Sequence, residues 1–134
     1  MARMTVVTSM LMLAATASWA AERPACLMVW VDENLPSQCA GLDIRAEGLR
    51  SPDVCITRNG DEATLQLKVT DCFQGTRAAS LPPAEQLQRV IQAQVTGAGD
   101  AKALTAHDNS SWPNAVRKLY AATVAWHRQR VGRN

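Results

Sequence analysis

Cysteine and histidine are the residues of this chain whose side chains most readily do chemistry. The four cysteines, Cys26, Cys39, Cys55 and Cys72, are separated by 12, 15 and 16 intervening residues. Structural zinc sites usually draw their cysteine ligands in pairs about two to four residues apart, because one turn must present two sulfurs to one ion. An even number of widely spaced cysteines is instead typical of disulfide bonds in an exported protein. We therefore predict two disulfide bonds and no metal site.

The two histidines, His107 and His127, are candidates for general-base catalysis. His107 precedes Asp108, but adjacency in sequence does not give the geometry in which a carboxylate orients an imidazole. The chain contains no Gly-x-Ser-x-Gly, His-Glu-x-x-His or phosphate-loop motif. We therefore lean against an enzyme, assign no catalytic residue and expect no cofactor. The alternative is a small secreted hydrolase or nuclease-like toxin that uses one of these histidines.

Charge is distributed unevenly along the chain, although its formal net charge is only +2. Residues 101–134 hold six basic residues and one acidic residue, including Arg117, Lys118 and Arg133, whereas residues 21–100 are net acidic. The functional hypothesis is a partner-binding face on the last helix, made of Trp112, Tyr120, Trp126, Arg128 and Arg130. The alternatives are cations that complement a helix C-terminus or pair with acids of the same fold, and aromatic rings that fill the core.

The first 20 residues predict a cleavable signal peptide. Arg3 precedes an uncharged, apolar run, and Ser18-Trp19-Ala20 supplies small residues before the expected cleavage point. The run is shorter than the roughly 20 apolar residues of a membrane-spanning helix. Residues 21–134 then form one small domain without a stable membrane span. The excess of Arg over Lys and the abundance of Ala favour a bacterial source, and hence a periplasmic or secreted protein.

Residues 25–72 predict a small antiparallel sheet of about four strands. The apolar run 26–31, which includes Trp30, is typical of a buried strand, and apolar residues alternate with polar ones over 42–47. Asn59-Gly60 suits a two-residue type I′ hairpin turn. This register places Leu65, Leu67 and Val69 on one apolar face and the intervening polar residues on the other.

The predicted hairpin also constrains the disulfide pairing. Cys55 would lie opposite Thr64, which leaves Cys72 roughly 26 Å further along the strand at about 3.3 Å per residue. Bridged cysteines need Cα atoms within about 7 Å of each other. Pairing of neighbours along the chain (26 with 39, 55 with 72) is therefore disfavoured. The sequence does not choose between the two remaining connectivities.

Residues 82–96 and 112–131 predict two helices. Pro82-Pro83 suits a helix start, and Leu87, Val90, Ile91 and Val95 recur at helical spacing. Ser111 is the expected N-cap of the last helix. Residues 100–109 fit either a short helix or a loop. Strands followed by helices predict a disulfide-stabilised α+β fold in which the helices pack on the sheet.

These features predict a small exported binding or accessory protein of the bacterial cell envelope: an adaptor, inhibitor, immunity or assembly factor that acts by protein–protein contact. The expected partner is another envelope or secreted protein. The near-neutral charge gives no reason to expect a nucleic-acid partner. A third hypothesis is a structural subunit that buries its last helix in a larger assembly.

Overall fold

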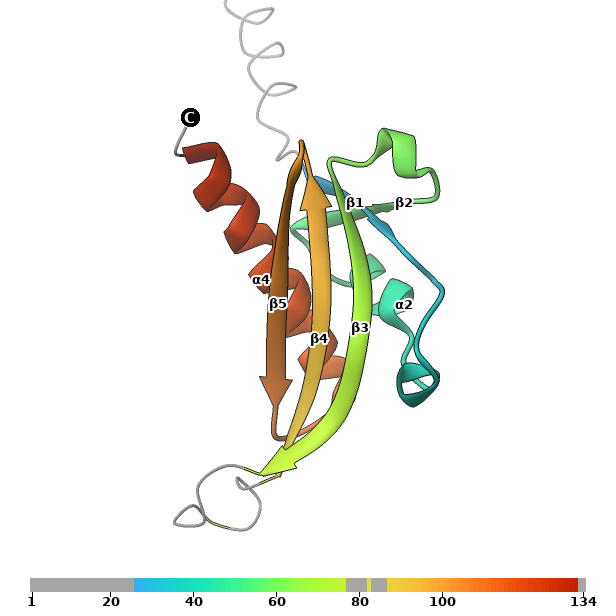
Figure 1. The fold of residues 1–134 in the computed structure, drawn as a ribbon, viewed down its shortest axis with the longest axis vertical. Helices are drawn as coiled ribbons and strands as arrows, with labels where there is room; N and C mark the ends of the chain where they lie inside the picture. The colour runs from blue at the N-terminus through green and yellow to red at the C-terminus, as the bar shows by residue number, and fades with distance from the viewer. Residues whose placement is uncertain (1–25, 77–81, 83–86, 133–134) are drawn as a thin grey trace, which may run out of the picture.

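The computed structural model describes residues 26–76, 82 and 87–132 of the chain. The elements, in order, are β1 (Leu27–Val31), η1 (Ser37–Cys39), α2 (Ile44–Leu49), β2 (Val54–Thr57), η2 (Gly60–Glu62), β3 (Leu65–Thr76), β4 (Leu87–Gly97), β5 (Asp100–Asp108) and α4 (Trp112–Gly132). Figure 1 shows α4 lying along one face of a sheet whose long strands are β3, β4 and β5. The predicted signal peptide lies outside the described residues.

The sheet is mixed, with its five strands in the order β2-β1-β3-β4-β5. β1 pairs in parallel with both β2 and β3, whereas β3, β4 and β5 form antiparallel pairs. The α+β class with disulfide bonds is confirmed. The sheet nevertheless differs from the four antiparallel strands expected within residues 25–72, because it extends through β5 and includes parallel strands.

The core lies between the sheet and α4. Leu65, Leu67 and Val69 of β3 are almost fully buried, while the alternate residues of this strand face solvent, as the apolar alternation predicts. The helix contributes a buried stripe that faces these strands, made of Ala115, Val116, Leu119, Tyr120, Thr123 and Val124. The opposite face of the long strands has no helix over it among the described residues, and it is mostly polar (Figure 1).

The hairpin predicted at Asn59-Gly60 does not form. Asn59 has a φ of −115° and its side chain caps η2, so the turn lacks the positive φ of a type I′ turn. β1 lies between β2 and β3, and residue Thr64 donates its backbone N–H to the carbonyl of Met28 at 2.9 Å. Pairing with the buried central strand outweighs the local turn signal.

The strand predicted over residues 42–47 does not form, because residues 44–49 make helix α2 (Ile44–Leu49). The carboxylate of Asp43 accepts the backbone N–H of Ala46 at 3.0 Å, which satisfies one of the free donors at the helix start. Gly48 allows α2 to approach its neighbours, because a Cβ there would lie 2.5 Å from Ile56 Cδ1 and 2.6 Å from the hydroxyl of Tyr120. The buried residues of α2 are Ile44, Glu47 and Gly48, which follow the spacing of a helix and not the alternation that suggested a strand.

The helix predicted over 82–96 is also wrong, because residues 87–97 form β4. Ile91, Ala93 and Val95 are buried at a spacing of two, so this segment satisfies the strand period as well as the helical one. Residues 100–108 form β5 rather than a short helix or loop. The turn between them uses positive φ at Ala98 (51°) and Gly99 (84°), which is the conformation of a tight hairpin. The last helix is confirmed as α4.

Both disulfide bonds are present and are interleaved along the chain. Cys26 is bonded to Cys55 and Cys39 to Cys72, with Cα–Cα distances of 5.5 and 5.4 Å. The exclusion of neighbour pairing is therefore confirmed, although for a different reason. β2 and β3 are not adjacent, since β1 separates them. The first bond ties the start of β1 to β2, and the second ties η1 to β3.

Candidate functional site

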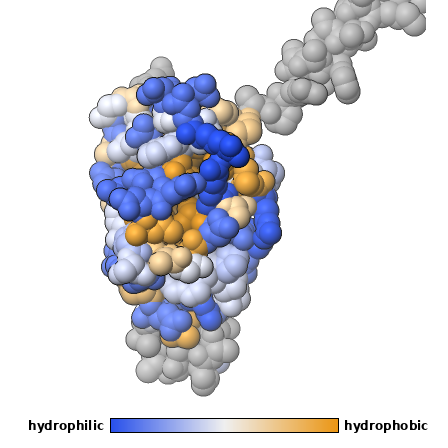
Figure 2. Space-filling view, turned by 90° about the vertical axis from the view of Figure 1, so that its right-hand side faces the viewer, coloured by the Kyte–Doolittle hydropathy of each residue, from blue (hydrophilic) through white to orange (hydrophobic). Residues whose placement is uncertain are grey.

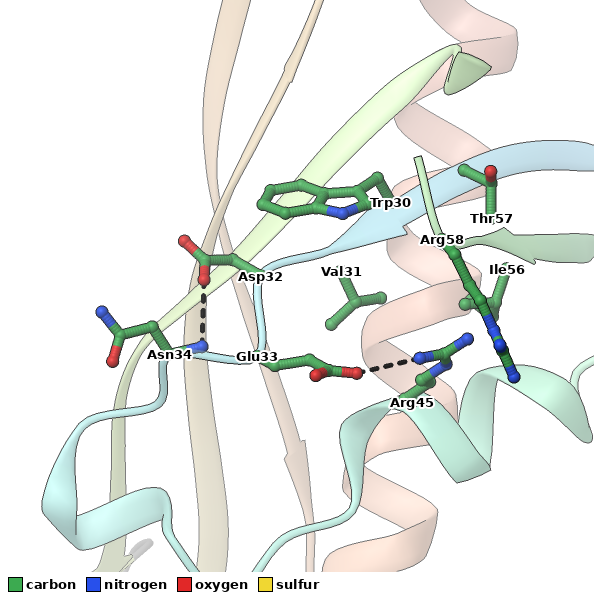
Figure 3. A pocket seen from close by; sticks show the side chains of 9 residues that line it. All are labelled: Trp30, Val31, Asp32, Glu33, Asn34, Arg45, Ile56, Thr57 and Arg58. Atoms are coloured by element: carbon green, nitrogen blue, oxygen red, sulfur yellow. Dashed lines mark hydrogen bonds and ion pairs between the residues drawn. The ribbon is translucent and has the colours of Figure 1, made fainter. Parts of the chain in front are cut away.

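A hollow on the described surface lies where the parallel strands β1 and β2 end. It has a volume of about 410 Å³. A second hollow of about 230 Å³ adjoins it and shares Val31, Asp32, Glu33 and Arg45 with it. We call the two together the strand-end groove. Its lining comes from the end of β1 and the loop after it, the first turn of α2, and the end of β2 (Figure 3).

The floor of the strand-end groove is apolar. Val31 and Ile44 are buried core residues, and Leu35, Leu42 and Ile56 are partly buried against the core. Figure 2 shows hydrophobic side chains gathered in the middle of the face that carries β2 and α2, framed by hydrophilic side chains. An apolar floor with a polar rim is the usual composition of a binding site, because the floor supplies affinity and the rim supplies orientation.

The rim of the larger hollow carries charges of both signs. Figure 3 shows Asp32 and Asn34 at one end and Arg45 and Arg58 at the other. Asp32 accepts the backbone N–H of Asn34 at 2.9 Å. A guanidinium nitrogen of Arg45 lies 3.0 Å from the carboxylate of Glu33, in a pair whose side chains are 32% and 68% exposed. Such an exposed pair contributes little to stability.

Arg58 differs from the other charged groups of the rim. It is exposed, and it has no hydrogen-bond or ion-pair partner among the described residues. Thr57 beside it is already committed, because its hydroxyl accepts the backbone N–H of Asn59 at 3.2 Å. The rim therefore offers one uncommitted guanidinium, and a second at Arg45 that shares its charge with Glu33. This arrangement can bind a carboxylate or another anion.

The strand-end groove was not predicted from the sequence. Arg45 fell within the strand predicted over 42–47, and Asp32, Glu33 and Arg58 were not among the candidate site residues. One signal was available in the sequence, because a run of polar residues directly follows the buried strand 27–31. The carboxyl ends of parallel strands are frequent ligand sites, but the parallel pairing itself was not foreseen.

The predicted partner-binding residues of α4 do not form one exposed surface. Tyr120 is only 1% exposed, and its hydroxyl donates a 2.7 Å hydrogen bond to the carbonyl of Ile44. Burial, together with the charges of Asp43 and Glu47, raises the pKa of Tyr120. Trp112 is partly buried against the core. These two aromatic side chains serve the core, which was the structural alternative.

Trp126 and Arg130 do lie together at the C-terminal end of α4. They line a hollow of about 320 Å³ with Asp100, Lys102 and other residues of the β5 start. The guanidinium of Arg130 sits 4.6 Å from the centre of the Trp126 ring and donates a hydrogen bond to the carbonyl of Gly97. It is also 3.9 Å from the carboxylate of Asp100. Arg130 therefore fastens the helix end to the β4–β5 turn.

Most cations of α4 are paired within the fold. Arg117 lies 3.0 Å from the carboxylate of Glu47, and Lys118 lies 2.8 Å from that of Asp108. Among the described residues of this helix, Arg128 alone is a cation without such a partner; Arg133 lies outside them. The basic end of the sequence thus largely neutralises acidic groups of the earlier elements.

Asp108 shows how closely this pairing is tied to the helix. Its carboxylate accepts the backbone N–H groups of Ser110 and Ser111 at 2.8 and 2.9 Å and the hydroxyl of Ser110 at 2.6 Å. Hydrogen bonding to Lys118, followed by that to Ser110, lowers the pKa of Asp108 well below its ordinary value. Ser111 accepts the N–H of Asn114 at 3.2 Å, which confirms the predicted cap.

The two histidines are not brought together. His107 is exposed on the open face of β5, and His127 is half-buried on α4. The Nδ1 atom of His127 is buried without a hydrogen-bond partner, and burial followed by the charge of Arg130 lowers its pKa. Neither residue lines any of the hollows described above. The histidine-based hydrolase stays a prediction without a site.

Comparison with known proteins does not assign the strand-end groove. No family model matches the chain, and a search of curated proteins finds no significant relative. Among the described residues, no helix is long and apolar enough to cross a membrane, and no group of His, Cys, Asp and Glu side chains is placed to hold a metal ion.

Proposed function

We propose that the protein is a small exported binding protein of the bacterial cell envelope, and that it contacts its partner through the strand-end groove. The observation that carries the proposal is the exposed, uncommitted Arg58 at the rim of an open hollow with an apolar floor. The pairing of the cations on α4 supports the same choice, because most of them form ion pairs within the fold.

The residue types at the groove support a protein partner. Tryptophan and arginine are enriched among the residues that dominate protein–protein binding energy, and they act best beside desolvated apolar contacts. Trp30, Arg45 and Arg58 meet Ile56 at the larger hollow. Trp30 was expected in the core but is only half-buried, because it alternates along β1 with the buried core residues Val29 and Val31.

The proposed compartment is the periplasm or the medium. Two disulfide bonds fit an oxidising environment, and the signal peptide expected at residues 1–20 would deliver the chain to it. The intact mass of the protein recovered from its native compartment tests this proposal. We expect loss of the first 20 residues and a gain of four hydrogens on reduction. A full-length chain or four free thiols would contradict it.

Photo-crosslinking in cells of the source organism tests the contact surface. A photoreactive residue replaces Leu35 in the groove, and in separate strains it replaces Ala103 on the open sheet face or Gln129 on α4. We expect a discrete adduct from position 35 and none from position 103 or 129. An adduct from position 129 alone would show that the partner binds the face of α4 predicted from the sequence. Adducts from position 103 alone would place the contact on the open face of the sheet.

A charge reversal sharpens this experiment. Arg58→Glu combined with the crosslinker at position 35 should abolish the adduct, because the groove rim then repels the same partner. Arg128→Glu is the matched control, since Arg128 is equally exposed and has no partner among the described residues. If Arg128→Glu abolishes the adduct and Arg58→Glu does not, the strand-end groove is not the contact surface.

A further inference from the structure

The charges of the strand-end groove are separated along its length. Asp32 stands at one end of the larger hollow, and Arg45 and Arg58 stand at the other (Figure 3). Asp32 has a backbone N–H as its partner, so its carboxylate retains acceptor positions, whereas Arg58 has no partner among the described residues. A ligand that spans the hollow therefore meets an acidic group first and a basic pair last, with apolar side chains between.

The groove continues beyond the larger hollow. The smaller hollow shares Asp32, Glu33 and Arg45 with it and extends toward Leu35, Leu42 and Asp43, so a bound chain can pass along the groove and need not terminate in it. Glu33 sits between the two hollows and holds Arg45 at 3.0 Å. Because this pair is exposed and weak, an incoming carboxylate can take the place of Glu33 at little energetic cost.

From this charge complementarity we propose that the groove binds a peptide segment within a partner protein that presents an acidic side chain to Arg58 and Arg45. An apolar side chain of the segment lies over Val31 and Ile56, and a basic side chain reaches Asp32. This inference rests on the proposed function and names the chemistry of the partner. A bidentate guanidinium–carboxylate contact gives both orientation and strength to such a site.

Neutralising Arg58 and neutralising Glu33 should change the affinity for the peptide in opposite directions. Arg58→Gln should weaken binding about 10- to 100-fold, which is the usual range for losing one charge-assisted hydrogen bond. Glu33→Gln should tighten binding about 2- to 5-fold, because it frees Arg45 and removes a competing carboxylate at an exposed pair. Arg128→Gln should leave binding unchanged. A purely structural role for these exposed residues would not give this reversal of sign.

Selection from displayed peptide libraries tests the inference. Two libraries of random peptides are used, one with the peptide fused at both ends and one with a free C-terminus. Each library is selected against the full oxidised protein and against its Arg58→Gln and Arg128→Gln variants. We expect the protein and Arg128→Gln to enrich internal Asp or Glu beside apolar and basic residues, and Arg58→Gln to lose this enrichment. Titration of the best synthetic peptide then gives the affinities of the Arg58, Glu33 and Arg128 variants.

Several outcomes would overturn the inference. These are enrichment of peptides without acidic side chains, enrichment only of free C-termini, equal selection by Arg58→Gln, or no enrichment at all. Thermal unfolding of each variant checks that it folds, which is expected because Arg58 and Glu33 are exposed. If crosslinking from position 35 persists while no acidic peptide is selected, the groove keeps its proposed function and only the chemistry of the partner is wrong.

Discussion

The parallel and antiparallel sides of the sheet are held together by different means. On the parallel side, β1, α2 and β2 have only five, six and four residues. One disulfide bond joins the start of β1 to β2, and the other joins η1, which lies between β1 and α2 in the chain, to β3. On the antiparallel side, β3, β4 and β5 have 12, 11 and nine residues and are covered by the 21-residue α4. Short elements bury little apolar surface, so the crosslinks compensate for the side that packing supports least.

The strand-end groove belongs to the crosslinked side. Its rim carries charged and partly exposed residues that contribute little to folding, and covalent bonds nearby hold the strands that position them. The antiparallel side, in contrast, uses its charged residues to fasten its own helix. The comparison indicates that the side with the proposed binding surface is the one whose scaffold is stabilised by covalent bonds. Five predictions test this contrast, from the largest expected effect to the smallest.

Removing a disulfide should give the largest loss. Cys39→Ala with Cys72→Ala should lower the free energy of unfolding by about 4 kcal/mol, since the bond closes a long loop. The Cys26–Cys55 bond closes a loop of similar length, but its side chains are only half-buried. Removing it with Cys26→Ala and Cys55→Ala should therefore cost about 1 kcal/mol less, because only the first pair also loses contacts of buried sulfur atoms. Urea denaturation measures both. Equal losses would show that loop closure alone matters.

Leu119→Ala should weaken the antiparallel side by about 3 kcal/mol, because Leu119 is fully buried between α4 and the sheet and its truncation leaves a cavity. Leu49→Ala is the matched control on the parallel side. Leu49 is 68% exposed, and its loss should change stability by less than about 0.5 kcal/mol. Comparable losses from the two variants would contradict the assignment of the core.

Asp108→Asn should cost about 2 kcal/mol at neutral pH, because the substitution removes the carboxylate that accepts the backbone N–H groups of Ser110 and Ser111 and pairs with Lys118. The pKa of Asp108 is lowered in the folded state. Its contribution is therefore present above the ordinary carboxyl pKa of 3.8 and is lost as pH falls below that value. Unfolding curves of the two proteins should converge in acid. A constant difference across this pH range would contradict the ion-pair account.

Tyr120→Phe tests the joint between the two sides. The hydroxyl of Tyr120 on α4 donates to the carbonyl of Ile44 at the start of α2. Its removal takes away one hydrogen bond between the two elements and should cost about 1 kcal/mol. Amide hydrogen exchange should quicken in α2 more than in β4. If exchange in β4 quickens equally, the two sides unfold as one unit.

Arg130→Gln and Arg128→Gln form the smallest contrast. Arg130 contacts the Trp126 ring and the β4–β5 turn, so its replacement should cost about 0.7 kcal/mol. Arg128 has no partner among the described residues, and its replacement should fall within about 0.5 kcal/mol of zero. Thermal denaturation separates them. A larger effect at Arg128 would place an unforeseen contact on that helix face.

The sequence predicted the features that depend on one clear local pattern. The alternation around Leu65, Leu67 and Val69 identified the buried face of β3, and the Ser111 cap with the long apolar stripe identified α4. The α+β class followed from these two halves. The two disulfide bonds were also predicted correctly, because an even number of widely spaced cysteines indicates them. Neighbour pairing was rightly disfavoured, but the hairpin on which that prediction depended does not form.

Other features depend on contacts between distant residues and could not be read locally. Leu87, Val90, Ile91 and Val95 recur at helical spacing, whereas Ile91, Ala93 and Val95 alternate as in a strand. Only pairing with β3 and β5 selects the strand. The Asn59-Gly60 pair predicted a hairpin between β2 and β3, but both strands instead pair in parallel with β1. The strand-end groove was missed for the same reason, since residues 30–34, 45 and 56–58 meet only after that pairing is known.

The interleaved bonds have a consequence for how the chain is oxidised as it emerges. Cys26 meets Cys39 before it meets its true partner Cys55, and Cys39 must wait for Cys72. Oxidation in order of appearance would therefore close the wrong ring first. Correct crosslinks require either thiols kept reduced until residue 72 is free, or an exchange catalyst that reopens the early bond. The yield of native protein should thus depend on disulfide-exchange capacity in the receiving compartment.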